Sequence, residues 1–133
     1  MTEPFVLPVT LVTASLLALW SLILAIRVSG MRVKHRISLG DQGNTDLIVR
    51  MRTHGNFVEY VPLILILMGL VEMAGGDSTI LAVTGAALVL FRLMHAIGMP
   101  RPAPNVFRAG GAMGTFLIVA ALSIWGIGIV VGG

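Results

Sequence analysis

The stretch of sequence that decides the fold runs from Arg52 to Met68 and reads RTHGNFVEYVPLILILM. Its first half carries Arg52, Asn56 and Glu59, and its last six residues are all apolar. The spacing i, i+4, i+7 places these three polar side chains on one face of a helix, because successive residues turn by about 100°. A cation, an amide and an anion are costly to place at the edge of a membrane-like segment, so they indicate a function.

The composition is that of a membrane protein. The 133 residues are 56% hydrophobic and 11% charged, and the mean hydropathy is +0.96. Soluble domains are roughly 45–50% apolar and about 25% charged, and a soluble chain this short would expose too much apolar surface. The sequence has no cysteine, which excludes disulfides, thiolate metal sites and cysteine nucleophiles. The three histidines show no metal-ligand spacing, so we expect no metal site.

Four apolar segments predict transmembrane helices at about residues 7–28, 45–73, 79–98 and 107–131. Each can supply the roughly 20 residues that cross a hydrocarbon core of about 30 Å. The first is interpreted as a retained helix and not a secretory signal, because Glu3 stands where a signal has basic residues. We therefore expect an all-α membrane protein, a four-transmembrane-helix bundle that forms a single domain over residues 1–133.

The links between these segments differ in character. Glycine and aspartate at 40–43 and 75–78 predict turns, and Asn44 or Asp46 can cap the second helix. Prolines at 100, 102 and 104 predict a stiff link. Basic residues gather at the links after the first and third helices: Arg32, Lys34, Arg36, Arg50, Arg52, Arg101 and Arg108. The positive-inside rule then places both links in the cytoplasm and both termini outside.

The polar stripe on the second helix has two interpretations. Arg52 and Glu59 can pair with each other or with neighbouring helices, as a purely structural staple. Alternatively, the stripe lines a polar pocket between helices or subunits. Arginine offers a planar fork to carboxylates, glutamate can hold an ammonium group, and Asn56 can pair with a peptide bond. Together these groups suit a small zwitterionic peptide.

The high pI, near 10.7, is attributed to membrane topology and not to nucleic-acid binding, because the sequence has no basic patch interleaved with aromatic residues.

A second stripe lies on the third helix, where Arg92, His95 and Met99 have the spacing i, i+3, i+7. This second stripe has two interpretations. Either it belongs to a binding site, or His95 is a hydrogen-bonded packing residue and Arg92 extends its charged end to the membrane surface. Arg108 stands at the start of the fourth helix, where the positive end of the helix macrodipole disfavours a cation. Another role should therefore explain it: it either anchors at lipid headgroups or stabilises an anion.

Two further features have simple structural interpretations. Gly110 and Gly114 form a Gly-x-x-x-Gly spacing, which predicts close helix packing. Glu72 lies near the outer end of the second helix, where we expect it to face headgroups.

The motif Arg52-x-x-x-Asn56-x-x-Glu59-Tyr60-x-Pro62, the four-helix hydropathy and the length together resemble the MAPEG family, the membrane-associated proteins in eicosanoid and glutathione metabolism. The chain is most similar to its small bacterial members, which implies a bacterial inner membrane. The resemblance implies a homotrimer of four-helix subunits. It also implies that glutathione, as co-substrate, is bound between adjacent subunits near the cytoplasmic face.

The resemblance also implies roles for individual residues. Arg52, Asn56, Glu59 and Tyr60 would contact glutathione from the second helix, and Arg92 and His95 match an Arg-x-x-His pattern of the prostaglandin E synthase branch. Arg108 matches an arginine proposed in that branch to stabilise the glutathione thiolate. Arg32 resembles another arginine near the thiol, with Arg27 as a competitor for that place. Ala109 stands where that branch has a serine, and Met99 replaces a tyrosine.

The activity expected from these implications is that of a glutathione-dependent membrane transferase or peroxidase acting on lipophilic electrophiles, of the EC 2.5.1.18 type if active. A thiol of the cysteine type has a pKa of about 8.5, and a nearby arginine lowers that pKa by favouring the thiolate. The alternative is a non-catalytic scaffold that binds lipid or glutathione. A small four-helix exporter would need a deep acidic residue without a cation nearby, whereas Glu59 lies two turns from Arg52.

Overall fold

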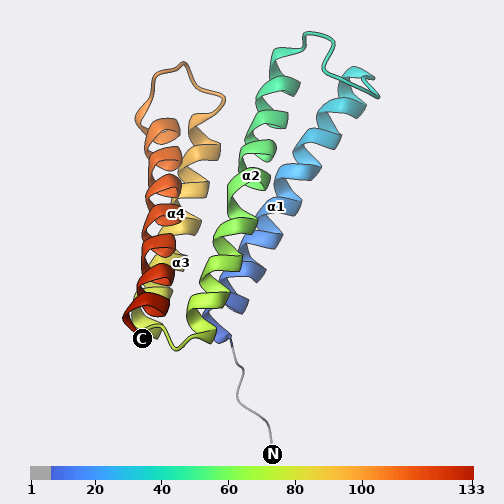
Figure 1. The fold of residues 1–133 in the computed structure, drawn as a ribbon. Helices are drawn as coiled ribbons and strands as arrows, with labels where there is room; N and C mark the ends of the chain where they lie inside the picture. The colour runs from blue at the N-terminus through green and yellow to red at the C-terminus, as the bar shows by residue number, and fades with distance from the viewer. Residues whose placement is uncertain (1–6) are drawn as a thin grey trace, which may run out of the picture.

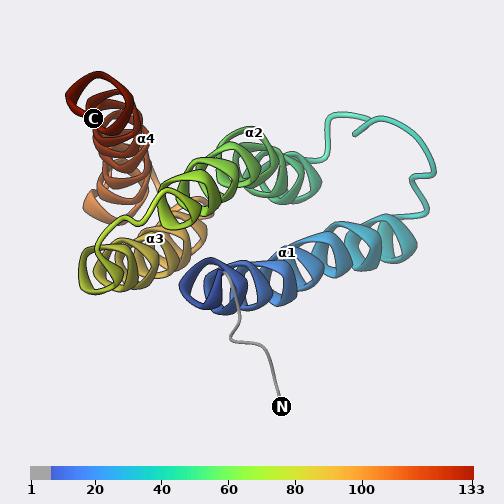
Figure 2. The ribbon, with the colours of Figure 1, turned by 60° about the horizontal axis from the view of Figure 1, so that its bottom comes forward.

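Two antiparallel helical hairpins pack side by side in the computed structural model, which describes residues 7–133 (Figure 1). The first hairpin pairs α1 (Pro8–His35) with α2 (Thr45–Met73), and the second pairs α3 (Ser78–Gly98) with α4 (Val106–Gly132). Helices α2 and α3 join the hairpins, because each of them contacts the other three helices (Figure 2). The links at 36–44 and 99–105 lie at one end of the bundle, and the 74–77 turn lies at the other.

The expected fold class is confirmed. All four helices are long and apolar enough to cross a membrane by length and composition. Large apolar side chains stay exposed on every helix, including Leu19, Ile66, Leu90 and Ile124, each at least 60% exposed. Such a surface is unfavourable in water and suits contact with lipid or another protein. The chain is therefore a multi-pass integral membrane protein with an all-α, four-helix architecture.

The first helix is longer than the sequence predicts. The hydropathy predicts an end near Val28, but α1 continues to His35 and stops where Arg36 adopts a left-handed conformation with φ 56° and ψ 43°. Met31, on the added turns, is buried in a small cluster with Ile37 and Leu47, which stabilises the extension. The first six residues, and with them Glu3, lie outside the described part of the chain.

Three helices begin with an asparagine or aspartate cap. The Asn44 side chain accepts a hydrogen bond from the Leu47 amide at 2.9 Å, and Asp77 does the same for Ile80 at 2.9 Å. Asn105 accepts from the amide of Arg108 at 2.8 Å. These bonds satisfy donors that helix geometry leaves unpaired. Asn44, one of the two candidates considered for α2, therefore supplies its cap.

The first helix has its cap from another helix, which corrects the interpretation of Glu72. The Glu72 carboxylate accepts hydrogen bonds from the amides of Val9 (3.0 Å) and Thr10 (2.9 Å), while Leu7 offers no side-chain cap. An acidic group at a helix N-terminus is also favoured by the macrodipole. Glu72 thus ties the end of α2 to the start of α1 instead of merely facing headgroups.

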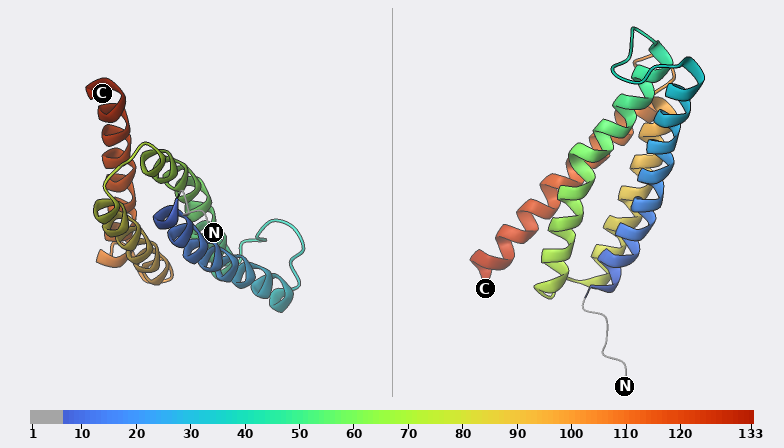
Figure 3. Two further views of the ribbon diagram at one scale, coloured as in Figure 1. Left: turned by 90° about the horizontal axis from the view of Figure 1, so that it is seen from below. Right: turned by 90° about the vertical axis from the view of Figure 1, so that its right-hand side faces the viewer.

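Close packing of α3 on α4 depends on glycine, but not on the expected pair. A Cβ at Gly111 would lie 2.6 Å from the backbone N of His95 and 2.6 Å from the carbonyl O of Phe91, and one at Gly114 would lie 2.5 Å from the Phe91 ring. A Cβ at Gly110 would meet only the end of the Met94 side chain, at 3.2 Å. The prediction of close packing at Gly114 is confirmed, but Gly111 and not Gly110 is its partner. Further along, α4 diverges from the other helices toward its C-terminal end (Figure 3).

Candidate functional site

A cavity of about 630 Å³ opens at the bundle end that carries the basic links. Three helices and the 99–105 link surround it. Its lining combines polar and charged side chains with small apolar ones: Met51, Arg52, Gly55, Asn56, Glu59, His95, Met99, Ala103, Pro104, Asn105, Arg108, Ala109 and Ala112. A concave site of this size with a few convergent polar groups is typical of small-molecule binding sites.

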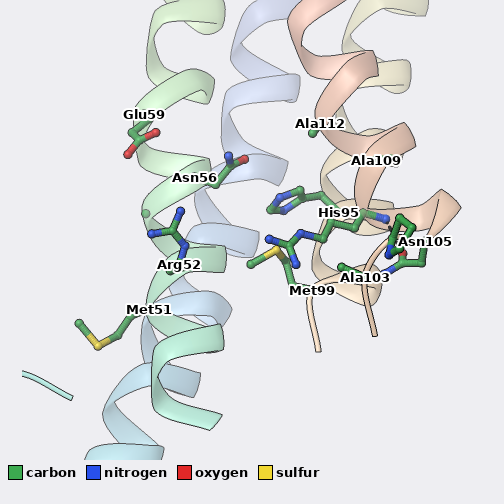
Figure 4. Close-up of a pocket in the computed structure, with 13 residues that line it drawn as sticks. Met51, Arg52, Asn56, Glu59, His95, Met99, Ala103, Asn105, Ala109 and Ala112 are labelled. Carbon is green, nitrogen blue, oxygen red and sulfur yellow. Dashed lines mark hydrogen bonds between the residues drawn. The ribbon is translucent and has the colours of Figure 1, made fainter. Parts of the chain in front are cut away.

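The α2 wall carries the whole polar stripe. Arg52, Asn56 and Glu59 all line the cavity, and Asn56 extends from α2 toward the His95 ring (Figure 4). The Oδ1 atom of Asn56 is buried and has no hydrogen-bond partner. Within residues 7–133, no ion pair joins Arg52 to Glu59, and both side chains are exposed. The staple interpretation therefore has no support within one protomer, and the stripe is free to meet a ligand.

His95 on α3 and Met99, directly after its end, form the second wall of the cavity, whereas Arg92 lies behind it. Both Arg92 and His95 are almost fully buried, with 2% and 3% exposure. One terminal nitrogen of Arg92, Nη2, lies 3.4 Å from His95 Nδ1, and the other, Nη1, donates to Thr115 Oγ1 at 3.3 Å. Its guanidinium also lies over the Phe57 ring at 5.8 Å, within the range of a cation–π contact. Arg92 is thus part of the site through His95 and is not itself a lining residue.

Arg108 enters from α4 and is positioned by backbone contacts. A Cβ at Gly98 would lie 2.7 Å from both Arg108 Cα and Asn105 Oδ1, so only glycine lets the end of α3 touch the start of α4. The Asn105 amide donates to the Gly98 carbonyl at 3.0 Å while its Oδ1 caps Arg108. Asn105 therefore holds both helix ends together and places Arg108 in the cavity that His95 also lines.

Besides Arg92, three residues considered for the site lie outside the lining in a single protomer. The Arg32 guanidinium donates to the carbonyls of Gly40 (2.8 Å) and Ile37 (3.3 Å), and it touches the sulfur of Met51 at 3.6 Å. Tyr60 packs edge-on against Phe116, with ring centroids 5.1 Å apart. Arg27 lies near Arg50, whose guanidinium donates to the Arg27 carbonyl at 3.4 Å. Their contribution to a site in an assembled oligomer stays a prediction.

Sequence reasoning missed three residues that position the other side chains of the site: Gly98, Asn105 and Thr115. Asn105 follows a proline-rich link and precedes an apolar helix, which is the usual position of an N-cap, so this signal was available. Gly98 and Thr115 gave no such signal, because their importance depends on which helix lies opposite. The Thr115 hydroxyl donates to the Gly111 carbonyl at 2.8 Å and so can accept from Arg92.

The arrangement suits an anionic or zwitterionic ligand. Two arginines, Arg52 and Arg108, face the cavity from different helices, and Glu59 supplies one carboxylate that can pair with an ammonium group. The described residues contain no cluster of three or more histidine, aspartate or glutamate side chains that could hold a metal ion. The class of protein is thus an integral membrane four-helix bundle with a polar cavity between its helices.

Comparison with known proteins gives the family. A model described as the MAPEG family matches residues 10–128, nearly the whole chain. The chain belongs to the MAPEG family. It is also similar to the inner membrane protein YecN of Escherichia coli strain K12 and to the protein of the same name from E. coli O6:H1 strain CFT073, each 38% identical over 68 residues. That match covers 51% of this chain and 52% of each relative, about half the length of either. No solved structure matches the chain significantly.

Proposed function

We propose that the protein is a glutathione-dependent membrane transferase or peroxidase that acts on lipophilic electrophiles. The observation that carries this proposal is the shared cavity: the α2 stripe of Arg52, Asn56 and Glu59 lines the same space as Arg108. Glutathione has two carboxylates, one ammonium group and two peptide bonds. The cavity offers arginines for the carboxylates, a glutamate for the ammonium and Asn56 for a peptide bond, so the two are complementary.

Arg108 would act on the reacting sulfur in this proposal. Only the thiolate is a good nucleophile, and a nearby guanidinium favours it over the thiol. The thiolate attacks an electrophilic carbon and forms a C–S bond as the leaving group departs with its electron pair. With a hydroperoxide, the thiolate attacks the outer oxygen, an S–O bond forms as the O–O bond breaks, and the alkoxide leaves and takes a proton from water. A second glutathione then attacks the sulfenic acid sulfur and gives the disulfide and water. Ala109 and Ala112 keep this part of the wall apolar, which suits a lipophilic second substrate.

The assembly and orientation belong to the same proposal. Arg52 and Glu59 are exposed in one protomer, and the cavity is open, so a neighbouring subunit of a homotrimer would complete it. The basic links at the cavity end favour the cytoplasmic side, with both termini outside. The two relatives are named inner membrane proteins, which supports the bacterial inner membrane as the location.

Replacement of the proposed thiolate-stabilising residue tests the activity. Arg108→Ala should abolish conjugation of glutathione to 1-chloro-2,4-dinitrobenzene and reduction of cumene hydroperoxide, with assembly by size exclusion unchanged. Arg101→Ala is the matched control, because Arg101 lies seven residues away on the 99–105 link, stacks on Phe107 at 5.3 Å and does not line the cavity. Equal rates in wild type and Arg108→Ala would refute the role. A wild type that binds glutathione without turnover would favour the scaffold alternative.

A further inference from the structure

Arg92 is the most deeply buried charged side chain described, and the proposed chemistry gives it no direct task. It is 2% exposed, lies outside the cavity lining and has no carboxylate partner within residues 7–133. A buried guanidinium without an anion is costly in a membrane protein. Its contacts are therefore informative: Thr115 Oγ1, His95 Nδ1 and the face of Phe57.

These contacts fix the direction of each hydrogen bond. Arginine has only donors, so the ring nitrogen of His95 that faces it must accept. An imidazolium carries a proton on both nitrogens and could not accept, so the ring beside Arg92 is neutral. The proton of the neutral ring then lies on the other nitrogen. The contact also fixes the ring orientation, because a flipped ring would place the carbon Cδ2 opposite Arg92 Nη2 and leave that donor without an acceptor.

The far side of the ring faces the cavity. His95 lines the cavity, and its Nε2 makes no hydrogen bond in the described chain. The second anchor of Arg92 strengthens the arrangement: Thr115 gives its own proton to the Gly111 carbonyl at 2.8 Å and accepts from Arg92 at 3.3 Å. A chain of directed bonds thus runs from α4 through Arg92 to the ring.

We infer that Arg92 is a positioning residue that sets the tautomer of His95, so that His95 presents an N–H donor to the ligand and takes no proton from it. His95 would therefore bind an anionic oxygen or sulfur atom of the ligand and would not serve as the base that deprotonates a thiol. The identity of that ligand as glutathione rests on the proposed function. The tautomer itself does not.

Nitrogen NMR of the ligand-free protein in detergent tests whether Arg92 sets the tautomer of His95. Imidazole ¹⁵N resonances differ strongly between protonated and bare nitrogens, and His35→Gln and His54→Gln variants assign the His95 signals. We expect one bare nitrogen and one protonated nitrogen on His95 in wild type and in Arg92→Lys, which keeps a donor. In Arg92→Met, which has none, the two tautomers should become mixed. A wild-type ring that is protonated on both nitrogens, or an even mixture of tautomers, would overturn the inference whether or not any ligand binds.

Titration with glutathione tests whether His95 donates a hydrogen bond to the ligand. Binding should move the resonance of the protonated nitrogen, and His95→Leu should weaken binding about tenfold, the value of one hydrogen bond of about 1.4 kcal/mol. His95→Gln, which retains an N–H donor, should restore most of the affinity. If wild type binds glutathione and His95→Leu binds equally well, the donor role is refuted while the proposed function stands. If wild type does not bind glutathione, the proposed function fails, and the ligand-free tautomer still decides the role of Arg92.

Discussion

Replacing Gly111 with alanine should separate α3 from α4 at the level of His95. A Cβ at this position would lie 2.6 Å from the His95 backbone N and the Phe91 carbonyl O, whereas ordinary contacts begin near 3.4 Å. Both neighbours are backbone atoms, so no side-chain rotation can relieve the clash. The helices would have to move apart by roughly 1 Å, and a gap of that size forfeits a quarter to a half of the dispersion energy of the atom pairs it opens.

The effect of Gly111→Ala on the free energy of unfolding can be estimated from the cost of overpacking and the gain in helix propensity. Overpacking of a close-packed interior costs about 1–3 kcal/mol, and the better helix propensity of alanine returns about 0.5–1 kcal/mol. Because both close neighbours are backbone atoms, the upper part of the overpacking range applies, about 2–3 kcal/mol, and Gly111→Ala should lower the free energy of unfolding by about 1–2.5 kcal/mol. Gly110→Ala is the matched control, since its Cβ meets only the flexible end of Met94. It should leave stability within about 1 kcal/mol of wild type.

Reversible unfolding in mixed detergent and SDS micelles, followed by far-ultraviolet circular dichroism, measures this difference. The same variants should separate in glutathione titration, because a shift of α3 against α4 moves His95 relative to Arg108. Equal stability of Gly111→Ala and wild type would refute the argument, as would a greater loss in Gly110→Ala. Gly128→Ala, with open space around its Cβ, shows the effect of helix propensity alone.

Three further substitutions test separate contacts. Glu72→Gln should cost about 1–2 kcal/mol of unfolding free energy, because two charge-assisted bonds to the α1 amides weaken, whereas Glu59→Gln should cost almost nothing in the same unfolding experiment. Asn105→Ala should cost about 1 kcal/mol through the lost cap, and it should lower the glutathione turnover number through misplacement of Arg108. Arg52→Gln should weaken glutathione binding about tenfold in calorimetry, as expected for loss of one charge-assisted contact, with the unfolding midpoint unchanged.

Much of the fold follows from hydropathy and turn chemistry. Apolar segments of about 20 residues predict the four helices because unpaired backbone groups are too costly in a bilayer. Asn44 was a foreseeable cap, and Pro62 does not end α2. The extension of α1 to His35 was not foreseeable, because it depends on Met31 meeting Leu47 from a different helix. Similarly, Glu72 looks like a surface charge until the start of α1 is placed beside it.

The candidate site also combines features that the sequence predicts with features that depend on contacts between helices. Helical periodicity on its own places Arg52, Asn56 and Glu59 on one face, and these three do line the cavity. Periodicity also aligns Arg92 with His95, but it cannot tell which of them faces the cavity and which lies behind. That distinction depends on Thr115 and Phe57, which belong to other helices. In the same way, the choice of Gly111 over Gly110 as the packing residue depends on the rotation of α4 about its axis, which a Gly-x-x-x-Gly spacing does not specify.

Glutathione titration of the purified protein, followed by thermal unfolding, tests the central proposal most directly. A ligand that binds only the folded state stabilises it by an amount that grows with concentration, about 2.7 kcal/mol at a hundredfold excess over the dissociation constant. The proposal predicts that the unfolding midpoint of wild type rises steadily with glutathione and that Arg52→Gln needs more ligand for the same rise. Glycylglycine at equal concentration should have no effect. An unchanged midpoint in millimolar glutathione would contradict the proposal that this cavity is a glutathione site.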